Sequence, residues 1–259
     1  MIFSPPNPTD STPAPRRPWI IGHRGASDAA PENTRSAIEA ALDTGCDGIE
    51  FDVQLTRDCI PVLYHDRTLY KISGQLKRLS TVDFDYLEKL DWGKWFSAEF
   101  TGERLLSLAD LLQDYAARTR LFMEIKSRSS DRPSGHHLKL TEIVVDMVHT
   151  LVAPEFHQDL FVLSFDREVL ERAHRLEPEW SYVWNVDNDD AMGMPEFVSA
   201  ICVPVKHITP QLVQEMHRLD KRVMTYTCNT PRQTDTATDA GVDGLMSDRP
   251  AWLMEYLSY

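Results

Sequence analysis

The segment AICVPVKHITPQLVQEMHRLDKRVMTYT, residues 200–227, contains the repeating pattern that decides the fold. The apolar run 200–203 predicts a buried strand. Thr209-Pro210 predicts a helix start, because threonine is a good cap and proline fits the first helical position. The run 222–227 predicts the next strand. A strand, a helix and a strand at this short spacing indicate a parallel β/α unit.

The same alternation recurs along the 259-residue chain from Trp19 onward. We expect strands at residues 19–22, 48–55, 61–64, 121–125, 160–164, 182–186, 200–203, 222–227 and 244–246. The second and third lie close enough to form a hairpin, so the chain counts eight strand–helix units. Eight units in one chain favour a closed (β/α)8 barrel over a doubly wound open sheet. No Gly-x-Gly-x-x-Gly follows a strand, which removes the usual support for a dinucleotide-binding sheet.

Helix starts are predicted from capping residues. Asn33 or Thr34 can cap the first helix, and Ser107 with Asp110 forms a capping box before the helix that precedes the third barrel strand. A weaker helical pattern occurs near residues 194–198. We therefore expect a helix there as well.

Two segments depart from the alternation. Residues 1–18 are Pro-rich, without the apolar stretch of a secretory signal, and are expected to form a tail before a barrel domain at 19–259. Residues 67–104 are irregular and rich in aromatic side chains, among them Phe84, Tyr86, Trp92, Trp95, Phe96 and Phe100. We expect this segment to be a small insertion after the second strand unit, folded over one end of the barrel.

Composition excludes some classes of protein. The net charge of −13 argues against a general nucleic-acid binder, which needs a basic surface. No apolar run approaches the roughly 18 residues of a transmembrane helix. The four cysteines, at positions 46, 59, 202 and 228, have no Cys-x-x-Cys spacing. Such thiols are typical of reduced residues in a cytoplasmic protein.

Three carboxylates interrupt otherwise apolar strands. Glu50 and Asp52 lie two residues apart on one strand, so both point to the same side, and Glu124 lies on the next barrel strand. Each alone would more often be a solvated or salt-bridged residue. Together they would repel one another unless a cation lay between them. Oxygen ligands predict Mg2+ or Ca2+.

Two cationic residues and two histidines are expected at the same mouth, because functional groups of such barrels sit at the carboxyl ends of the strands. Arg24 follows the first strand and Lys126 the fourth, and both could neutralise a phosphate. His23 and His65 could exchange protons near neutral pH. The constellation predicts metal-assisted phosphoryl transfer.

These residues also lie in motifs that resemble the glycerophosphodiester phosphodiesterase family from Gly22 to Pro250. The matching segments are His23-Arg24-Gly25-Ala26, Pro31-Glu32-Asn33-Thr34, Ile49-Glu50-Phe51-Asp52-Val53, Val62-Leu63-Tyr64-His65-Asp66, Glu124-Ile125-Lys126, Ser164-Phe165, Gly241-Val242-Asp243-Gly244 and Ser247-Asp248-Arg249-Pro250. The resemblance implies a TIM barrel that cleaves a glycerophosphodiester, a small-molecule substrate, to sn-glycerol 3-phosphate and an alcohol. It implies Mg2+ or Ca2+ on Glu50, Asp52 and Glu124, and a phosphate held by Arg24 and Lys126. His65 would be the acid and His23 the base, with the two roles exchangeable.

Three sites depart from the family pattern. In the insertion, Lys71-Ile72-Ser73-Gly74 stands where the family often has a Thr-Thr-x-Gly-like stretch. Tyr226 stands where the family commonly has tryptophan, in Tyr226-Thr227-Cys228-Asn229, so it keeps an aromatic wall but adds a hydroxyl to the substrate pocket. With the 67–104 insertion, which we expect to line the mouth, it should influence the choice of alcohol. Cys59 replaces the usual glycine of the hairpin turn. Because cysteine disfavours positive φ, we expect another turn geometry.

Two alternatives remain open. Related phospholipase D enzymes that cleave lysophospholipids or other diesters share the His-Arg-Gly and Glu-x-Asp layout, and the aromatic insertion could provide an apolar rim for an acyl chain. A non-catalytic barrel that binds phosphorylated ligands is the other, although no proposed catalytic or metal residue is missing.

Overall fold

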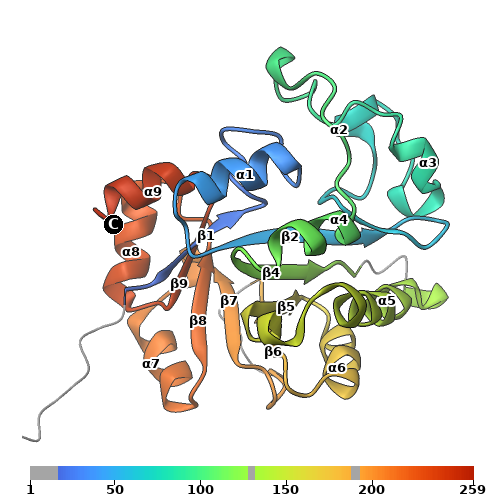
Figure 1. Ribbon diagram of the computed structural model, residues 1–259. Coiled ribbons are helices and arrows are strands. Elements are labelled where there is room, and N and C mark those ends of the chain that lie inside the picture. The colour runs from blue at the N-terminus through green and yellow to red at the C-terminus, as the bar shows by residue number, and fades with distance from the viewer. Residues whose placement is uncertain (1–16, 128–131, 188–192) are drawn as a thin grey trace, which may run out of the picture.

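The computed structural model describes residues 17–127, 132–187 and 193–259. The predicted tail, residues 1–18, lies almost entirely outside them. Eight parallel strands close into a barrel, because β1 pairs with both β2 and β9 (Figure 1). The barrel strands are β1 Trp19–His23, β2 Gly48–Leu55, β4 Arg120–Ile125, β5 Leu160–Ser164, β6 Ser181–Asn185, β7 Ala200–Pro204, β8 Arg222–Tyr226 and β9 Gly244–Ser247. A ninth strand, β3 (Pro61–Leu63), pairs antiparallel with β2, so the predicted barrel and hairpin are both confirmed.

The helices that cover the barrel are α1 Arg35–Asp43, α4 Leu108–Tyr115, α5 His136–Leu151, α6 Arg167–Leu176, α7 Pro210–Arg218, α8 Pro231–Ala240 and α9 Pro250–Tyr256. Short 3-10 turns occur at Leu79–Thr81, Ala98–Phe100, Arg132–Ser134, Pro154–Asp159 and Val205–His207. Thr34 is the residue that caps α1, since its side chain accepts from the Ala37 amide. Ser107 caps α4 through the Asp110 amide, as the sequence predicts.

The predicted helix near residues 194–198 is wrong. Among the described residues between β6 and β7, 193–199 form turns and bends rather than a helix. Gly193 adopts φ 84°, outside the helical region, and Pro195 has no amide hydrogen to donate. Between described residues, the one local backbone bond of this segment is a single turn from the Val198 amide to the Pro195 carbonyl. The apolar spacing therefore reflects burial of Val198 without helical geometry.

Apolar side chains fill the barrel and the space around it. Inside the strands lies a cluster of nine buried residues: Ile21, Phe122, Phe161, Leu163, Val183, Ala200, Cys202, Met224 and Met246. A larger cluster packs the outer faces of the strands against the helices. The interior is a solid core, so polar side chains that point inward near the carboxyl ends of the strands face the mouth.

The insertion, residues 67–104, has its own small core. It contains α2 (Tyr70–Ser73) and α3 (Phe84–Leu87), which lie to one side of the barrel beyond the end of β2 (Figure 1). Leu69, Leu79, Leu87 and Trp92 pack in one cluster with Val62 of β3 and with Tyr64, which follows it. The aromatic and apolar residues of this segment therefore hold it together and attach it to the barrel.

The hairpin turn keeps the geometry that glycine would give it, so the expected change of geometry is wrong. Cys59 adopts φ 68°. The Thr56 hydroxyl donates to Asp58 at 2.6 Å and accepts from the Ile60 amide at 2.9 Å. These bonds hold the turn closed and offset the strain of a left-handed cysteine.

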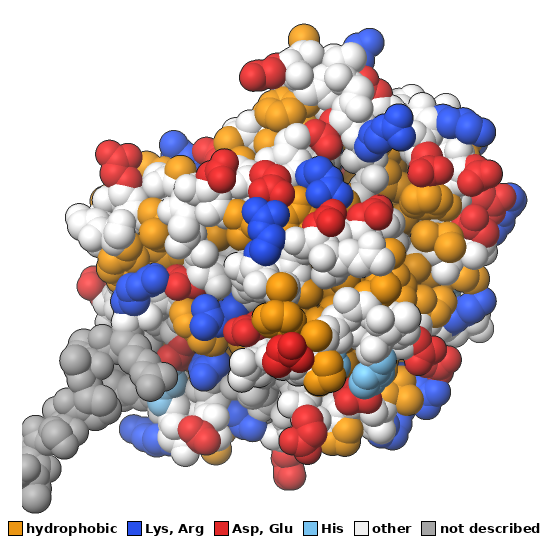
Figure 2. Space-filling view, in the orientation of Figure 1, with side chains coloured by type: hydrophobic (Ala, Val, Ile, Leu, Met, Phe, Trp, Pro, Cys, Tyr) orange, Lys and Arg blue, Asp and Glu red, His pale blue; other side chains and the backbone are white. Residues whose placement is uncertain are grey.

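Charges on the surface are interspersed. Figure 2 shows acidic and basic side chains alternating over the visible face, with apolar side chains between them. The four cysteines are unpaired, and three of them are buried. Within the described residues, every helix is too short or too polar to traverse a bilayer.

Candidate active site

A cavity of about 560 Å³ opens at the carboxyl ends of the strands. Seven of the eight predicted site residues line it: His23, Arg24, Glu50, His65, Glu124, Lys126 and Tyr226. The eighth, Asp52, is buried beside them and pairs with Lys126 and Arg24. The barrel thus brings together residues that are up to 203 positions apart in the chain, as the strand pattern predicts (226 − 23).

The three predicted metal ligands form one group. Asp52 and Glu124 are partners in the register of β2 and β4, and Glu50 lies two residues before Asp52 on the same face. Each of the three offers a carboxylate oxygen, and these oxygens lie within 4.8 Å of one another. All three residues are at least nine-tenths buried.

Burial and crowding set the charge state of this group. Burial and the nearby charge of Asp52 raise the pKa of Glu50 to about 8. Burial also opposes the charge of Asp52, but Lys126 and Arg24 more than offset it and hold the pKa of Asp52 well below its ordinary value. A buried set of hard oxygens, one of which is difficult to ionise without a further positive charge, fits a divalent cation.

Lys126 and Arg24 contact the carboxylates from two sides. The Lys126 ammonium lies 2.7 Å from both Asp52 Oδ1 and Glu124 Oε1. Arg24 donates its backbone amide to Glu50 Oε2 at 3.0 Å, and its Nε lies 3.2 Å from Asp52 Oδ2. Burial lowers the pKa of Lys126, but the two carboxylates raise it further, so the net shift is upward and the side chain stays charged.

His23 is held by an aspartate from the other end of the chain. Its Nδ1 lies 2.5 Å from Asp248 Oδ1, and its Nε2 lies 3.9 Å from Glu50 Oε2. Burial lowers the pKa of His23, yet the hydrogen bond to Asp248 and the charge of Glu50 outweigh burial and raise it. Asp248 directs Nε2 of the ring toward the carboxylates.

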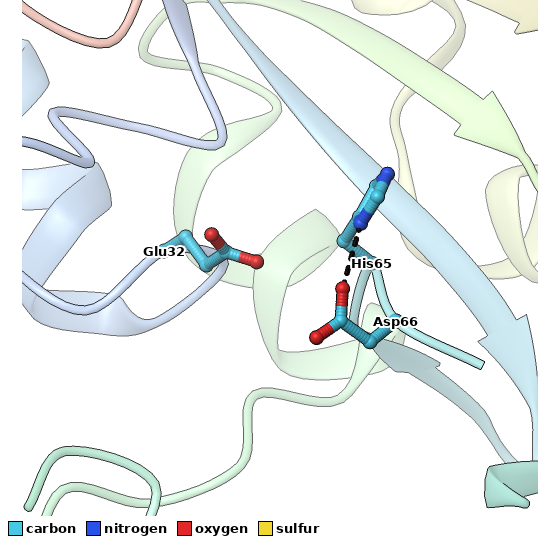
Figure 3. A group of neighbouring side chains, drawn as sticks. All are labelled: Glu32, His65 and Asp66. Carbon is cyan, nitrogen blue, oxygen red and sulfur yellow. Dashed lines mark hydrogen bonds and ion pairs between the residues drawn. The ribbon is translucent and has the colours of Figure 1, made fainter. Parts of the chain in front are cut away.

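His65 is held by its neighbour in sequence. Figure 3 shows the ring and Asp66 following β3, with the Glu32 carboxylate pointing toward both. His65 Nδ1 lies 3.0 Å from Asp66 Oδ1. Lys71 of the insertion lies 3.3 Å from Asp66 Oδ2 and 2.8 Å from Glu32 Oε1. Both histidines therefore contact an aspartate through Nδ1.

Sequence reasoning missed several polar residues of the site. Asp248 lies in a matched motif, but nothing local to Ser247-Asp248 indicates that it meets His23. Asn185 donates to Glu124 at 3.3 Å and Asn33 donates to Asp52 at 2.8 Å. Asn185 and Asp248 both lie at strand ends. That position is a sequence signal from which these two residues could have been predicted.

Tyr226 forms one wall of the cavity. Its hydroxyl donates to the Val186 carbonyl at 3.2 Å, and its ring meets Phe165 edge to face. Among the described residues that line the cavity, none comes from the insertion, so the expectation that residues 67–104 line the mouth is wrong. The insertion reaches the site through Lys71, whose ammonium pairs with Glu32 and Asp66.

A (β/α)8 barrel whose mouth gathers carboxylates, histidines and cations is typical of TIM-barrel enzymes that act with a divalent metal ion. The Glycerophosphoryl diester phosphodiesterase family matches residues 23–252, most of the chain. The chain belongs to this family, and the expected family and enzyme class are confirmed.

Relatives of similar length support this membership. The chain is 28% identical over 240 residues to the glycerophosphodiester phosphodiesterase of Caldanaerobacter subterraneus, covering 91% of this chain and 96% of the relative. It is 26% identical to that of Bacillus altitudinis, covering 89% and 94%. The structure of an Oleispira antarctica phosphodiesterase in complex with sn-glycerol-3-phosphate superposes with a TM-score of 0.84 at 23% identity, covering 93% and 97%, and shows the same fold.

Proposed function

We propose that this chain hydrolyses glycerophosphodiesters to sn-glycerol 3-phosphate and an alcohol, with a divalent cation on Glu50, Asp52 and Glu124. The observation that supports this most is the convergence on one cavity of three buried carboxylates and two histidines. Family membership points to the same reaction. The oxygen-only donor set favours Mg2+ or Ca2+, since zinc in proteins commonly recruits nitrogen or sulfur.

His23 and His65 would transfer the protons. With Nδ1 of each ring bonded to an aspartate, Nε2 is the atom that exchanges a proton with the substrate. We assign His23 as the base that accepts the proton of the attacking hydroxyl. His65 would then protonate the departing alkoxide, and the two roles could be exchanged. An aspartate behind each ring stabilises the imidazolium that forms during the reaction.

Arg24 and Lys126 would hold the phosphate. Both line the cavity and stay charged, and both lie against the carboxylates. When bound, the cation polarises a phosphoryl oxygen as a Lewis acid. Arg24 would orient the phosphate by paired hydrogen bonds, and Lys126 would supply a point charge. Tyr226 would face the substrate as a wall of the pocket.

The decisive test is a panel of glycerophosphocholine, glycerophosphoethanolamine and glycerophosphoglycerol, assayed with Mg2+, with Ca2+ and with EDTA. We expect turnover with at least one metal and loss with EDTA. His65→Ala should lose turnover, whereas His217→Ala should retain it, because His217 pairs with Asp243 outside the cavity. Turnover that survives both EDTA and His65→Ala would refute the mechanism.

A second substrate class is lysophospholipids. Phe165 lines the cavity and is 40% exposed, which gives the mouth an apolar edge. An acyl chain could pack on this edge. Lysophosphatidylcholine in the same panel separates the two classes, because a preference for it over glycerophosphocholine would assign the chain to lysophospholipid cleavage.

A further inference from the structure

A second group of side chains at the mouth has the spacing of a metal site. Glu32, His65 and Asp66 offer ligand atoms within 4.8 Å of one another. Lys71 supplies a positive charge to this group, with its ammonium 2.8 Å from Glu32 Oε1 and 3.3 Å from Asp66 Oδ2. The chain therefore neutralises these carboxylates with its own cation.

Lys71 is firmly attached to the insertion. It belongs to α2, and its ammonium lies 5.0 Å from the centre of the Trp95 ring, a cation–π contact. Trp95 in turn donates its indole hydrogen to the Trp92 carbonyl at 2.9 Å. Trp92 is buried in the core of the insertion. The position of this ammonium is thus set by how the insertion packs.

We propose that Lys71 is a positioning residue for the reaction, acting on His65 through Asp66. This inference rests on the proposed role of His65 in proton transfer. It makes the insertion part of the catalytic machinery, although no residue of 67–104 lines the cavity among those described.

Both carboxylate oxygens of Asp66 have a partner. Oδ1 contacts His65 Nδ1 at 3.0 Å, and Oδ2 contacts the Lys71 ammonium. A carboxylate held at both oxygens cannot rotate without losing one partner. The Asp66 side chain is 35% exposed, so without Lys71 it could turn toward water and lose its bond to His65 Nδ1. Lys71 therefore holds the carboxylate that holds the histidine.

Glu32 extends the same network to the phosphate-binding side. Its Oε1 contacts both Lys71 and Arg24, whose Nη1 lies 3.3 Å away. Removing the ammonium would leave Glu32 with Arg24 alone and Asp66 with His65 alone, so more negative charge would face an anionic substrate. Lys71 thus orders His65 and also offsets charge that would repel a phosphodiester.

The test is Lys71→Met compared with Lys77→Met. Lys77 is a matched control because it lies on the same insertion, its ammonium lies 4.6 Å from the centre of the Tyr86 ring, and within the described residues it forms no ion pair. With glycerophosphocholine and saturating metal, Lys71→Met should lower kcat by about 10–100-fold, by analogy with the loss seen when a partner that orients a metal-binding histidine is removed. Lys77→Met should keep the wild-type kcat. KM should change less than kcat, and Lys71→Arg should restore most of the activity.

Two further variants separate the possible failures. If His65→Ala retains activity, the proposed function fails. If His65→Ala is inactive while Lys71→Met matches Lys77→Met in kcat, this inference alone fails. A lower melting temperature with unchanged kcat would show that Lys71 only stabilises the insertion, which also overturns it. Finally, Lys71→Met and Asp66→Asn should be less than additive, and full additivity would contradict action through Asp66.

Discussion

Replacing Asp248 by asparagine should disable His23, because the neighbouring hydrogen bonds allow the new amide group only one orientation. Asn229 donates its Nδ2 to Asp248 Oδ2 at 2.6 Å, while Asn229 Oδ1 accepts from the Ser247 hydroxyl and the Asp248 amide. Asn229 therefore cannot flip without losing both of those bonds. In Asp248→Asn, the amide oxygen must face Asn229, and the new NH2 group must face His23 Nδ1. The neutral ring then accepts a hydrogen bond at Nδ1 and carries its own hydrogen on Nε2. In this tautomer Nε2 has no lone pair with which to accept a proton, so the ring cannot act as the base.

The expected loss follows from the contact that is removed. The Nδ1–Oδ1 distance of 2.5 Å marks a charge-assisted hydrogen bond. Such bonds are worth about 1.5–3 kcal/mol. At about 1.4 kcal/mol for each factor of ten in rate, kcat should fall by about 10–150-fold. The tautomer cost adds to this, so the figure is a lower bound.

The assay is steady-state hydrolysis of glycerophosphocholine at saturating metal, with kcat and KM fitted separately. Asp243→Asn is the matched control, because it removes an aspartate that contacts His217 Nε2 at 2.9 Å away from the cavity. The control should keep the wild-type kcat. If Asp248→Asn also keeps it, Asp248 does not set the form of His23 and the reasoning is refuted.

Three smaller predictions follow from local geometry. Cys59→Gly removes the strain of a cysteine in the left-handed region, about 1–2 kcal/mol, but makes the unfolded chain more flexible, which costs about 0.5–1 kcal/mol of stability. The melting temperature should therefore rise slightly, and a fall in a thermal scan would contradict this. Tyr226→Phe loses the bond to the Val186 carbonyl but keeps an aromatic wall of the cavity. The ratio of the KM values for glycerophosphocholine and glycerophosphoethanolamine should therefore shift, while kcat for each substrate changes little. An unchanged ratio would show that Tyr226 has no part in selecting the alcohol. The hydrogen bond with His65 lowers the pKa of Asp66 to about 2, so this group stabilises the fold above its ordinary pKa of about 3.9 and loses that effect as pH falls through the folded value. In urea titrations, the stability gap between wild type and Asp66→Asn should therefore close as pH falls through this window, and a constant gap would disprove the linkage.

The barrel could be predicted because its signals are local. Each strand is a short apolar run, and pairs such as Thr209-Pro210 mark helix starts regardless of what packs nearby. The failures had equally local causes. At 194–198 burial of Val198 produced a helix-like spacing in a segment whose described backbone makes a single turn from Val198 to Pro195. At Cys59 the side-chain bonds of Thr56, which lies three residues earlier, decide the geometry. Propensity alone does not include such contacts.

The candidate site was only partly predictable for a related reason. Residues whose own chemistry breaks an apolar strand, such as Glu50 and Glu124, are visible in the sequence because unpaired charge there is costly. Residues that act by holding another side chain are not. Asp248 looks like an ordinary loop aspartate until β9 pairs with β1 and sets it beside His23. Lys71 looks like one of several surface lysines until α2 docks beside Asp66.

The two histidines consequently depend on different parts of the fold. His23 is oriented by Asp248, 225 residues away, so its geometry requires the closing pair of strands β1 and β9. His65 is oriented by the adjacent Asp66, and that aspartate is held by an insertion with a core of its own. Damage to the insertion should therefore impair the step assigned to His65 while leaving His23 in place. A substrate with a good leaving group, such as a p-nitrophenyl diester, needs little help from an acid. It should rescue Lys71→Met but not Asp248→Asn if His65 is the acid, and the reverse pattern would exchange the two roles.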